Sequence, residues 1–263
     1  MPAPGRRSTT ARYARHVADS LSPGAARSFG SEADRYDRFR PGPPDEALDW
    51  LVGEHCGAAL DVGAGTGAMS RRLAERAGRV VAVEPDARML AVLHRRSPAA
   101  GAVVGAAEHL PLASGQFDVV VVSSAWHWME PAAASMEIAR VLRPGGVFGV
   151  LWSGADRSVD WVGEVLAAPA GTPVRHHRRT VDLPPGAPFE RPELASLQWT
   201  LPRTGPELLG LAGTYSSVLI RTPAEQRAAR SRVEGAIDSI MQGADDGVRE
   251  LPMRARCWRA VRT

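Results

Sequence analysis

Apolar and polar positions follow two alternating patterns over residues 46–152. Short apolar runs, typical of buried parallel strands, are separated by stretches with apolar residues three or four positions apart, typical of amphipathic helices. The predicted strands are 58–62, 79–83, 101–105, 117–123 and 146–152. The predicted helices are 46–52, 70–76, 86–95 with Asp86 as its N-cap, and 131–142. This alternation predicts right-handed crossovers and a doubly wound α/β fold with a parallel sheet.

The pattern weakens after Trp152, where prolines and scattered arginines fill residues 169–192. We interpret 153–195 as a loop or cap insertion, because this composition is typical of irregular structure. At the other end, residues 1–27 are rich in Arg, Ser, Ala and Pro, and we expect a mobile basic segment there. Residues 28–262 are long enough for a single α/β domain with a sizeable core.

Strand and helix patterns return towards the C-terminus. Residues 197–201 and 253–261 alternate as strands do, and helical patterns cover 206–212 and 223–241. The two strands bring the predicted sheet to seven strands.

The most distinctive motif follows the first predicted strand. Residues 60–67 read LDVGAGTG, which places Gly63, Gly65 and Gly67 where a strand crosses into a helix. Glycines at such a crossing let the backbone approach a ligand closely. Residues 63–68 also satisfy the dinucleotide fingerprint G-x-G-x-x-G/A, so the glycines alone leave both a nicotinamide cofactor and S-adenosylmethionine open.

Two acids at strand ends narrow this choice. A pyrophosphate would meet an unpaired carboxylate at Asp61, whereas an ammonium and a sulfonium would be attracted to it. Asp61 therefore favours S-adenosylmethionine over a nicotinamide cofactor. Glu84 ends the second strand, at about the twenty-residue spacing that lets an acid accept hydrogen bonds from ribose hydroxyls. Because both cofactors contain a ribose, Glu84 does not discriminate between them.

Five segments in this order resemble the class I S-adenosylmethionine-dependent methyltransferases of the ubiquinone/menaquinone-biosynthesis-like (type 11) group, which includes trans-aconitate methyltransferases. The segments are LDVGAGTG (60–67), VEPD (83–86), GAAEHLP (105–111), FDVV (117–120) and VLRPGG (141–146). The resemblance covers residues 28–155 firmly. It implies a Rossmann-like sheet in the order 3-2-1-4-5-7-6 with an antiparallel last strand, and helices within 206–241 on the substrate side. It also implies methyl transfer from S-adenosylmethionine with release of S-adenosylhomocysteine.

The resemblance assigns roles around the cofactor. The glycine backbone and Asp61 surround the methionine and ribose portion, and Glu84 holds the ribose hydroxyls. Met89 covers the adenine face, although outside this context it is typical of a core residue. Ala107 contacts adenine through its backbone, and Glu108 lies near the adenine amino group. The predicted cofactor-binding residues are Tyr36, Arg40, Asp61, Gly63, Ala64, Gly65, Gly67, Glu84, Pro85, Met89, Ala107, Glu108 and Ser123.

An upstream segment resembles the part of the family that folds over the cofactor. Tyr36 and Arg40 suit the carboxylate of the methionine portion, since a guanidinium can bind it in a bidentate manner. The alternative is a surface helix with Arg40 in solvent. Phe29, in the same upstream region, is a predicted substrate contact.

The predicted catalytic residue is His127, which lies between Trp126 and Trp128 just after the fourth strand. An imidazole titrates near neutral pH, so His127 is a candidate general base for a hydroxyl, an amine or an acidic carbon. The alternative is that His127 hydrogen-bonds within its loop or orients the substrate. Trp126 and Trp128 are predicted substrate contacts in an apolar pocket, with packing as the alternative.

Composition excludes several other functions. All 32 basic residues are arginines and the formal net charge is only +3, which is typical of GC-rich coding rather than of polyanion binding. Base methyltransferases commonly place Asn/Asp-Pro-Pro-aromatic after the fourth strand, where this chain reads SSAW (123–126). We therefore expect no nucleic-acid partner. No apolar run reaches membrane-spanning length, and we expect no membrane partner, a cytoplasmic location, and either a monomer or a homodimer.

Metal binding and disulfide formation are not expected. Cys56 and Cys257 have no partner at metal-ligand spacing and fit a reducing compartment. His176 and His177 lack a third ligand.

No sequence feature selects one methyl acceptor. We expect a small, partly aromatic or apolar metabolite, as in natural-product biosynthesis, with an anionic acceptor bound by Arg175, Arg178 or Arg179 as an alternative. Two other functions stay open: an enzyme that cyclises or cleaves S-adenosylmethionine, and a cofactor-binding protein without turnover. Asp61 and residues 105–110 disfavour a nicotinamide-dependent oxidoreductase.

Overall fold

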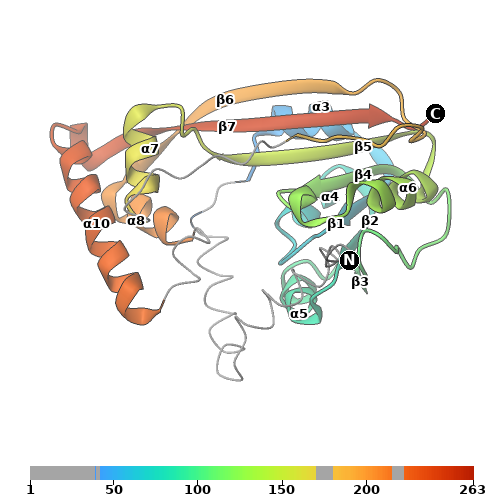
Figure 1. Cartoon of the computed structure of the whole chain (residues 1–263), viewed down its shortest axis with the longest axis horizontal. Coiled ribbons are helices and arrows are strands. Elements are labelled where there is room, and N and C mark those ends of the chain that lie inside the picture. The colour runs from blue at the N-terminus through green and yellow to red at the C-terminus, as the bar shows by residue number, and fades with distance from the viewer. Residues whose placement is uncertain (1–38, 40–41, 170–179, 215–221) are drawn as a thin grey trace, which may run out of the picture.

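The computed structural model describes residues 39, 42–169, 180–214 and 222–263. The strands in this part of the chain are β1 (Cys56–Val62), β2 (Ala77–Glu84), β3 (Gly101–Val104), β4 (Phe117–Ser123), β5 (Leu142–Ala155), β6 (Glu193–Thr204) and β7 (Val248–Val261). They form one sheet in the order β3-β2-β1-β4-β5-β7-β6 (Figure 1). β1 to β5 pair in parallel, whereas β7 is antiparallel to both β5 and β6. The predicted fold class and strand order are confirmed.

Helices cover both faces of the sheet. Those in the described residues are α3 (Asp45–Val52), α4 (Ala68–Ala74), α5 (Ala87–Arg96), α6 (Pro131–Val141), α7 (Asp160–Ala167), α8 (Gly205–Gly213) and α10 (Pro223–Met241), with 3₁₀ turns η1 (Trp126–Trp128) and η2 (Asp245–Gly247). In the described part of the chain, no helix combines the length and the apolar character that crossing a membrane requires.

Strand β4 shows why the central strands read as continuous apolar runs. Val119 and Val121 pack with α3, α4 and α5 on one face, whereas Val120 and Val122 pack with α6 on the other. Successive side chains of a strand point to opposite faces, so a strand covered by helices on both sides has no polar face. The run VVVV is the sequence signature of this central position.

The N-terminus of α5 confirms a predicted cap. The Asp86 carboxylate accepts a hydrogen bond of 2.9 Å from the Arg88 backbone N–H. The Arg88 guanidinium donates back to the same carboxylate, and the pKa of Asp86 is lowered chiefly by this side-chain hydrogen bond. The cap fixes where β2 turns into α5, which is also where the acid Glu84 ends the strand.

The interpretation of 153–195 as a loop or cap insertion was wrong in part. β5 continues to Ala155, helix α7 follows at Asp160–Ala167, and β6 already begins at Glu193. The apolar residues of α7 recur at helical spacing, but the helix has only eight residues and therefore gives a weak periodic signal. Residues 170–179 lie outside the described residues, as does the predicted mobile segment 1–27.

The predicted helices near 206–212 and 223–241 are present as α8 and α10. Together with α7 they form a helical lobe at the left of Figure 1. This lobe lies where β6 ends and β7 begins. An apolar cluster from the three helices and the nearby part of β7 forms its core.

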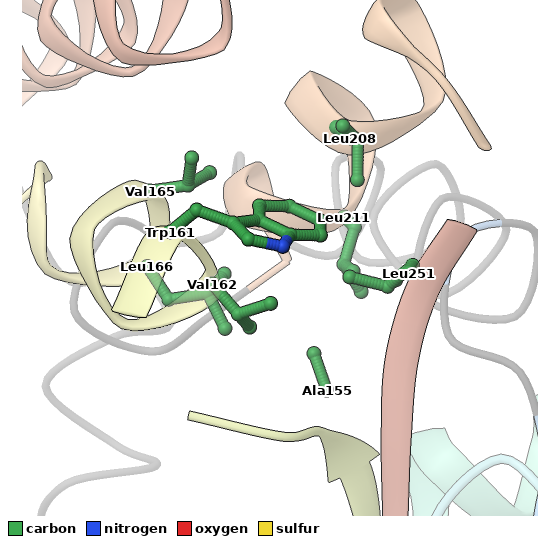
Figure 2. Close-up of a pocket in the computed structure, with 8 residues that line it drawn as sticks. All are labelled: Ala155, Trp161, Val162, Val165, Leu166, Leu208, Leu211 and Leu251. Atoms are coloured by element: carbon green, nitrogen blue, oxygen red, sulfur yellow. The ribbon is translucent and has the colours of Figure 1, made fainter. Parts of the chain in front are cut away.

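A small apolar cavity lies within this helical lobe (Figure 2). The Trp161 indole from α7 points across it towards the leucines of α8. Its volume of about 10 Å³ is room for one water-sized sphere, too little for a metabolite. It is lined by Ala155, Trp161, Val162, Val165, Leu166, Leu208, Leu211 and Leu251. We interpret it as a packing gap of the lobe.

Two helical glycines test how tightly the lobe is packed. A Cβ added to Gly210 would lie 2.4 Å from Phe39 Cε1, whereas a Cβ on Gly235 would meet nothing within 4 Å. We expect G210A to lower the free energy of unfolding by about 1–3 kcal/mol, because the ring must move. We expect the matched control G235A to raise it by about 0.5–1 kcal/mol through helix propensity. Urea unfolding measures both, and equal effects of the two variants would contradict the close contact.

Candidate active site

The glycine loop between β1 and α4 has a backbone that only glycine adopts without strain. Gly63, Gly65 and Gly67 have φ angles of 70°, 56° and 86°, all in the left-handed region. The N–H groups of Gly63 and Ala64 donate to the Val83 carbonyl at 2.8 and 3.2 Å, which ties the loop to the end of β2. The predicted strand-to-helix crossing is therefore present and is fixed by backbone hydrogen bonds.

Neighbouring elements approach this loop closely at Gly63. A Cβ at this position would lie 2.7 Å from the Ala125 Cβ and 3.2 Å from the Met129 Cε. Both residues belong to the segment that follows β4, so Gly63 lets this segment pack directly against the glycine loop. The loop and the predicted catalytic stretch are therefore in contact.

Glu84 bridges two turns at the ends of β1 and β2. Its side chain is buried, one oxygen accepts from the Gly65 N–H at 3.0 Å, and the other accepts from the Asp86 N–H at 3.1 Å. A carboxylate oxygen can accept more than one hydrogen bond, so these contacts are compatible with the predicted ribose contact. They also show a second role, because Glu84 holds the glycine loop and the start of α5 together.

Asp61 is fully buried beneath the same loop. Its Oδ2 accepts a hydrogen bond of 2.6 Å from the Ser70 hydroxyl on α4, and its Oδ1 has no hydrogen-bond partner in the described part of the chain. Burial, helped by the nearby Glu84 charge, raises the pKa of Asp61 to about 7 against the lowering effect of the Ser70 hydrogen bonds. A buried carboxylate oxygen without a donor fits a ligand that brings a positive charge or an N–H or O–H group.

The predicted adenine-binding residues lie on two neighbouring elements. On α5, the half-buried Met89 has its Sδ 4.0 Å from a Cβ position at Gly65, so it borders the glycine loop. Pro85 is exposed just before this helix. After β3, Ala107 is buried, and the half-buried Glu108 accepts a hydrogen bond of 2.8 Å from the Glu130 N–H.

The aromatic residues that follow β4 differ in how far they are exposed to solvent. Ser123, half-buried, is the last residue of the strand, and Ser124 takes a left-handed φ of 55°. His127 and Trp128 are exposed with their rings 4.8 Å apart. Trp126 is 3% exposed and packs on Phe148 at 5.4 Å. Trp126 is thus packed in the core here, in agreement with the packing alternative, and substrate contact by Trp126 or Trp128 stays a prediction.

Several predicted residues lie outside the described part of the chain. These are Phe29, Tyr36 and Arg40, together with the Arg175–Arg179 region that carries His176 and His177. Among the described residues, no group of three or more His, Cys, Asp or Glu side chains could hold a metal ion. Cys56 is half-buried and Cys257 is buried, and both are free thiols in this structure.

Two functional contacts were missed by sequence reasoning. Ser70 was assigned only to a helix, yet its hydroxyl is the hydrogen-bond donor to Asp61. No sequence signal indicated this contact, because the burial of Ser70 with Met69 and Leu73 on one face of α4 is seen only in the structure. The second contact, between Glu108 and the Glu130 backbone, carries no sequence signal because the two residues are 22 positions apart.

Comparisons with known proteins agree with this geometry. A family profile described as a methyltransferase domain matches residues 60–150. A methyltransferase of Mycobacterium tuberculosis without an assigned activity is 40% identical over 238 residues, covering 89% of this chain and 95% of the relative. The chain belongs to the class I S-adenosylmethionine-dependent methyltransferase family. The residues of this methyltransferase that match the profile include the glycine loop and the ends of β1, β2 and β4.

Other relatives support the same family. The solved structure of a protein assigned as a type II methyltransferase from Anaeromyxobacter dehalogenans has a TM-score of 0.64 and 28% identity, covering 85% of this chain and 98% of that one. A malonyl-[acyl-carrier protein] O-methyltransferase of Enterobacter lignolyticus is 33% identical over 135 residues, covering 50% of this chain and 54% of the relative. The second match is limited to about half of each protein.

The raised pKa of Asp61 predicts a pH-dependent stability. An ordinary Asp titrates near 3.8, so between this pH and about 7 the folded protein retains a proton that the unfolded chain releases. Stability therefore falls as pH rises through this window and levels off above it. In D61N this slope is absent, and we expect its unfolding free energy relative to wild type to rise by roughly 2–3 kcal/mol from about pH 5 to about pH 8.

Urea unfolding of the ligand-free protein across this pH range measures the effect. S70A serves as a second variant, because loss of the Ser70 hydrogen bond removes a contact that lowers the pKa of folded Asp61 and so moves the upper end of this window to higher pH. Parallel stability curves for wild type and D61N would show that Asp61 titrates at its ordinary pKa.

Proposed function

We propose that this methyltransferase transfers the methyl group of S-adenosylmethionine to an oxygen, nitrogen or carbon atom of a small-molecule metabolite by in-line displacement, with release of S-adenosylhomocysteine. The observation that carries the proposal is the packing of Ala125 on Gly63, which sets the segment after β4 against the glycine loop. His127 and Trp128 are exposed on this segment. An acceptor held by them would lie beside the cofactor loop.

The chain's own residues divide the task of binding. S-adenosylmethionine, when bound, supplies an electrophilic methyl group on a positively charged sulfur. Asp61 offers an unpartnered carboxylate oxygen to the positive methionine portion, and Glu84 offers carboxylate oxygens to the ribose hydroxyls. Met89, beside Gly65, offers a flexible apolar surface to the adenine ring.

General-base catalysis by His127 would account for only part of the rate acceleration. Alignment of an acceptor with the methyl group can contribute up to about 7–11 kcal/mol, whereas general-base catalysis typically contributes about 10²–10⁴-fold, or roughly 3–5 kcal/mol. Positioning is therefore the larger contribution, and no covalent enzyme intermediate is needed. The exposed Trp128 ring supports an acceptor with an apolar or aromatic part.

Calorimetry of the cofactor site is the first experiment. We expect S-adenosylmethionine and S-adenosylhomocysteine to bind with micromolar affinity and NAD not to bind. D61N keeps the shape of the side chain but loses its charge, so we expect it to weaken S-adenosylmethionine binding about 10–100-fold, the usual effect of losing a charged hydrogen bond. Asp118→Asn, an acid at the opposite end of β4, is the matched control, and we expect the same affinity as wild type. Binding of NAD alone would overturn the proposal.

An acceptor screen then distinguishes the reaction classes. Release of S-adenosylhomocysteine with a methylated product supports the proposal. Release of methylthioadenosine would instead identify an enzyme that cleaves or cyclises its cofactor. Tight binding without turnover over a broad acceptor panel would favour a binding protein.

The role of His127 is tested with the acceptor that this screen identifies. If the imidazole accepts the proton, we expect H127N to lower kcat by about 10²–10⁴-fold and to remove the acidic limb of the kcat–pH profile. H94N, an exposed histidine on α5, is the matched control. A smaller loss with an unchanged pH profile would make His127 a positioning residue.

A further inference from the structure

The segment that carries His127 and Trp128 is fixed at both ends by groups of the cofactor site. We call residues 124–130 the β4–α6 loop. At its start, the Ser124 N–H donates to the Leu151 carbonyl at 2.8 Å, and the next residue, Ala125, packs on Gly63. At its end, the Glu130 N–H donates to Glu108 Oε1 at 2.8 Å. The loop therefore spans from the glycine loop to Glu108, the residue that the family resemblance places near the adenine amino group.

Hydrogen bonds and ring packing hold the middle of the loop together, so a displacement at one end of the loop also displaces the middle. The Trp128 N–H donates to the Ala125 carbonyl at 2.9 Å, and the Met129 N–H donates to the Trp126 carbonyl at 3.1 Å. The Trp126 ring is buried against Phe148, and this packing restricts rotation of the turn about its own axis. Because these contacts hold residues 125–129 together, we expect the 3₁₀ turn to move as one unit when one of its ends moves.

The far end of the loop is also the start of α6. The Glu130 side chain caps this helix by accepting from the N–H groups of Ala132 and Ala133 at 3.1 and 2.7 Å. Its backbone N–H is therefore the group that joins loop and helix to Glu108. The side chain and the backbone of Glu130 serve different neighbours, so they can be removed separately.

We infer that Glu108 is a positioning residue: through its hydrogen bond to the Glu130 N–H, it couples the adenine end of the cofactor site to the position of the loop that presents His127 and Trp128 to the acceptor. This inference rests on the proposed function for the identity of the ligand. It goes beyond it, because Glu108 then acts on the acceptor side as well as on the cofactor side. A ligand that binds at Glu108 therefore also orders the β4–α6 loop.

Two variants at position 130 isolate this hydrogen bond. E130A removes the helix cap but keeps the N–H, whereas E130P removes the cap and the N–H together. Proline suits the position, because Glu130 has φ −85° and the preceding Met129 is extended at φ −91° and ψ 158°. The difference between the two variants therefore reports on the bond to Glu108.

Hydrogen exchange, measured by mass spectrometry with and without S-adenosylhomocysteine, gives a readout that needs no turnover. We expect the ligand to slow exchange in peptides covering 60–70 and 124–130 in wild type and in E130A. In E130P we expect protection of 60–70 to remain and protection of 124–130 to be lost. With an identified acceptor, we expect kcat of E130P to be about 10–100-fold below that of E130A, because misplaced groups lose rate without losing cofactor affinity.

The outcomes separate the two proposals. No protection of either peptide in wild type would mean that the cofactor site, and with it the proposed function, fails. Protection of 60–70 with equal behaviour of 124–130 in E130A and E130P would overturn the coupling alone. If E130P does not fold, E108A and E108Q replace it: glutamine keeps an acceptor oxygen, so we expect E108Q to restore the loop protection that E108A loses, and equal protection in both would overturn the coupling.

Discussion

The carboxylate of Glu84 is the interaction on which the site depends, because it holds together the two turns from which the site is built. One oxygen binds the glycine loop after β1 and the other binds the start of α5 after β2. Parallel strands bring their carboxyl ends to one edge of the sheet, but they leave the loops at that edge free to separate. A buried acid that accepts from both backbones fixes the loops before any ligand arrives, which is the preorganisation that binding requires.

The fold up to Trp152 could be predicted because its signals are local. The run VVVV of β4, the glycines at 63, 65 and 67 and the cap Asp86 each report a constraint that acts within a few residues. Helix α7 was missed because eight residues give little periodicity, and the surrounding prolines suggested a loop. Its apolar face matters only once α8 and α10 are present to cover it.

The positions of the acids and glycines of the candidate site could be predicted from the sequence. Its contacts between residues that are brought together only by folding could not. Trp126 and Trp128 are two positions apart in one short turn, and only the packing of Phe148 decides that the first is buried and the second exposed. Likewise, Ser70 was a plain helix residue until the fold set it under Asp61. Neither outcome depends on residue type alone, since tertiary packing selects which side of a turn is covered.

The same packing shows how, under the proposed function, one small loop would serve both the cofactor and the acceptor. Gly63 has no side chain, so the β4–α6 loop lies directly on the backbone of the glycine loop. Asp61 beneath it accepts a hydrogen bond from the Ser70 hydroxyl and keeps its other oxygen without a donor in the described part of the chain, which destabilises the ligand-free protein. A ligand that satisfies this oxygen recovers that free energy as affinity. Under the proposed function, the stability lost at Asp61 would therefore favour the binding of a positively charged cofactor.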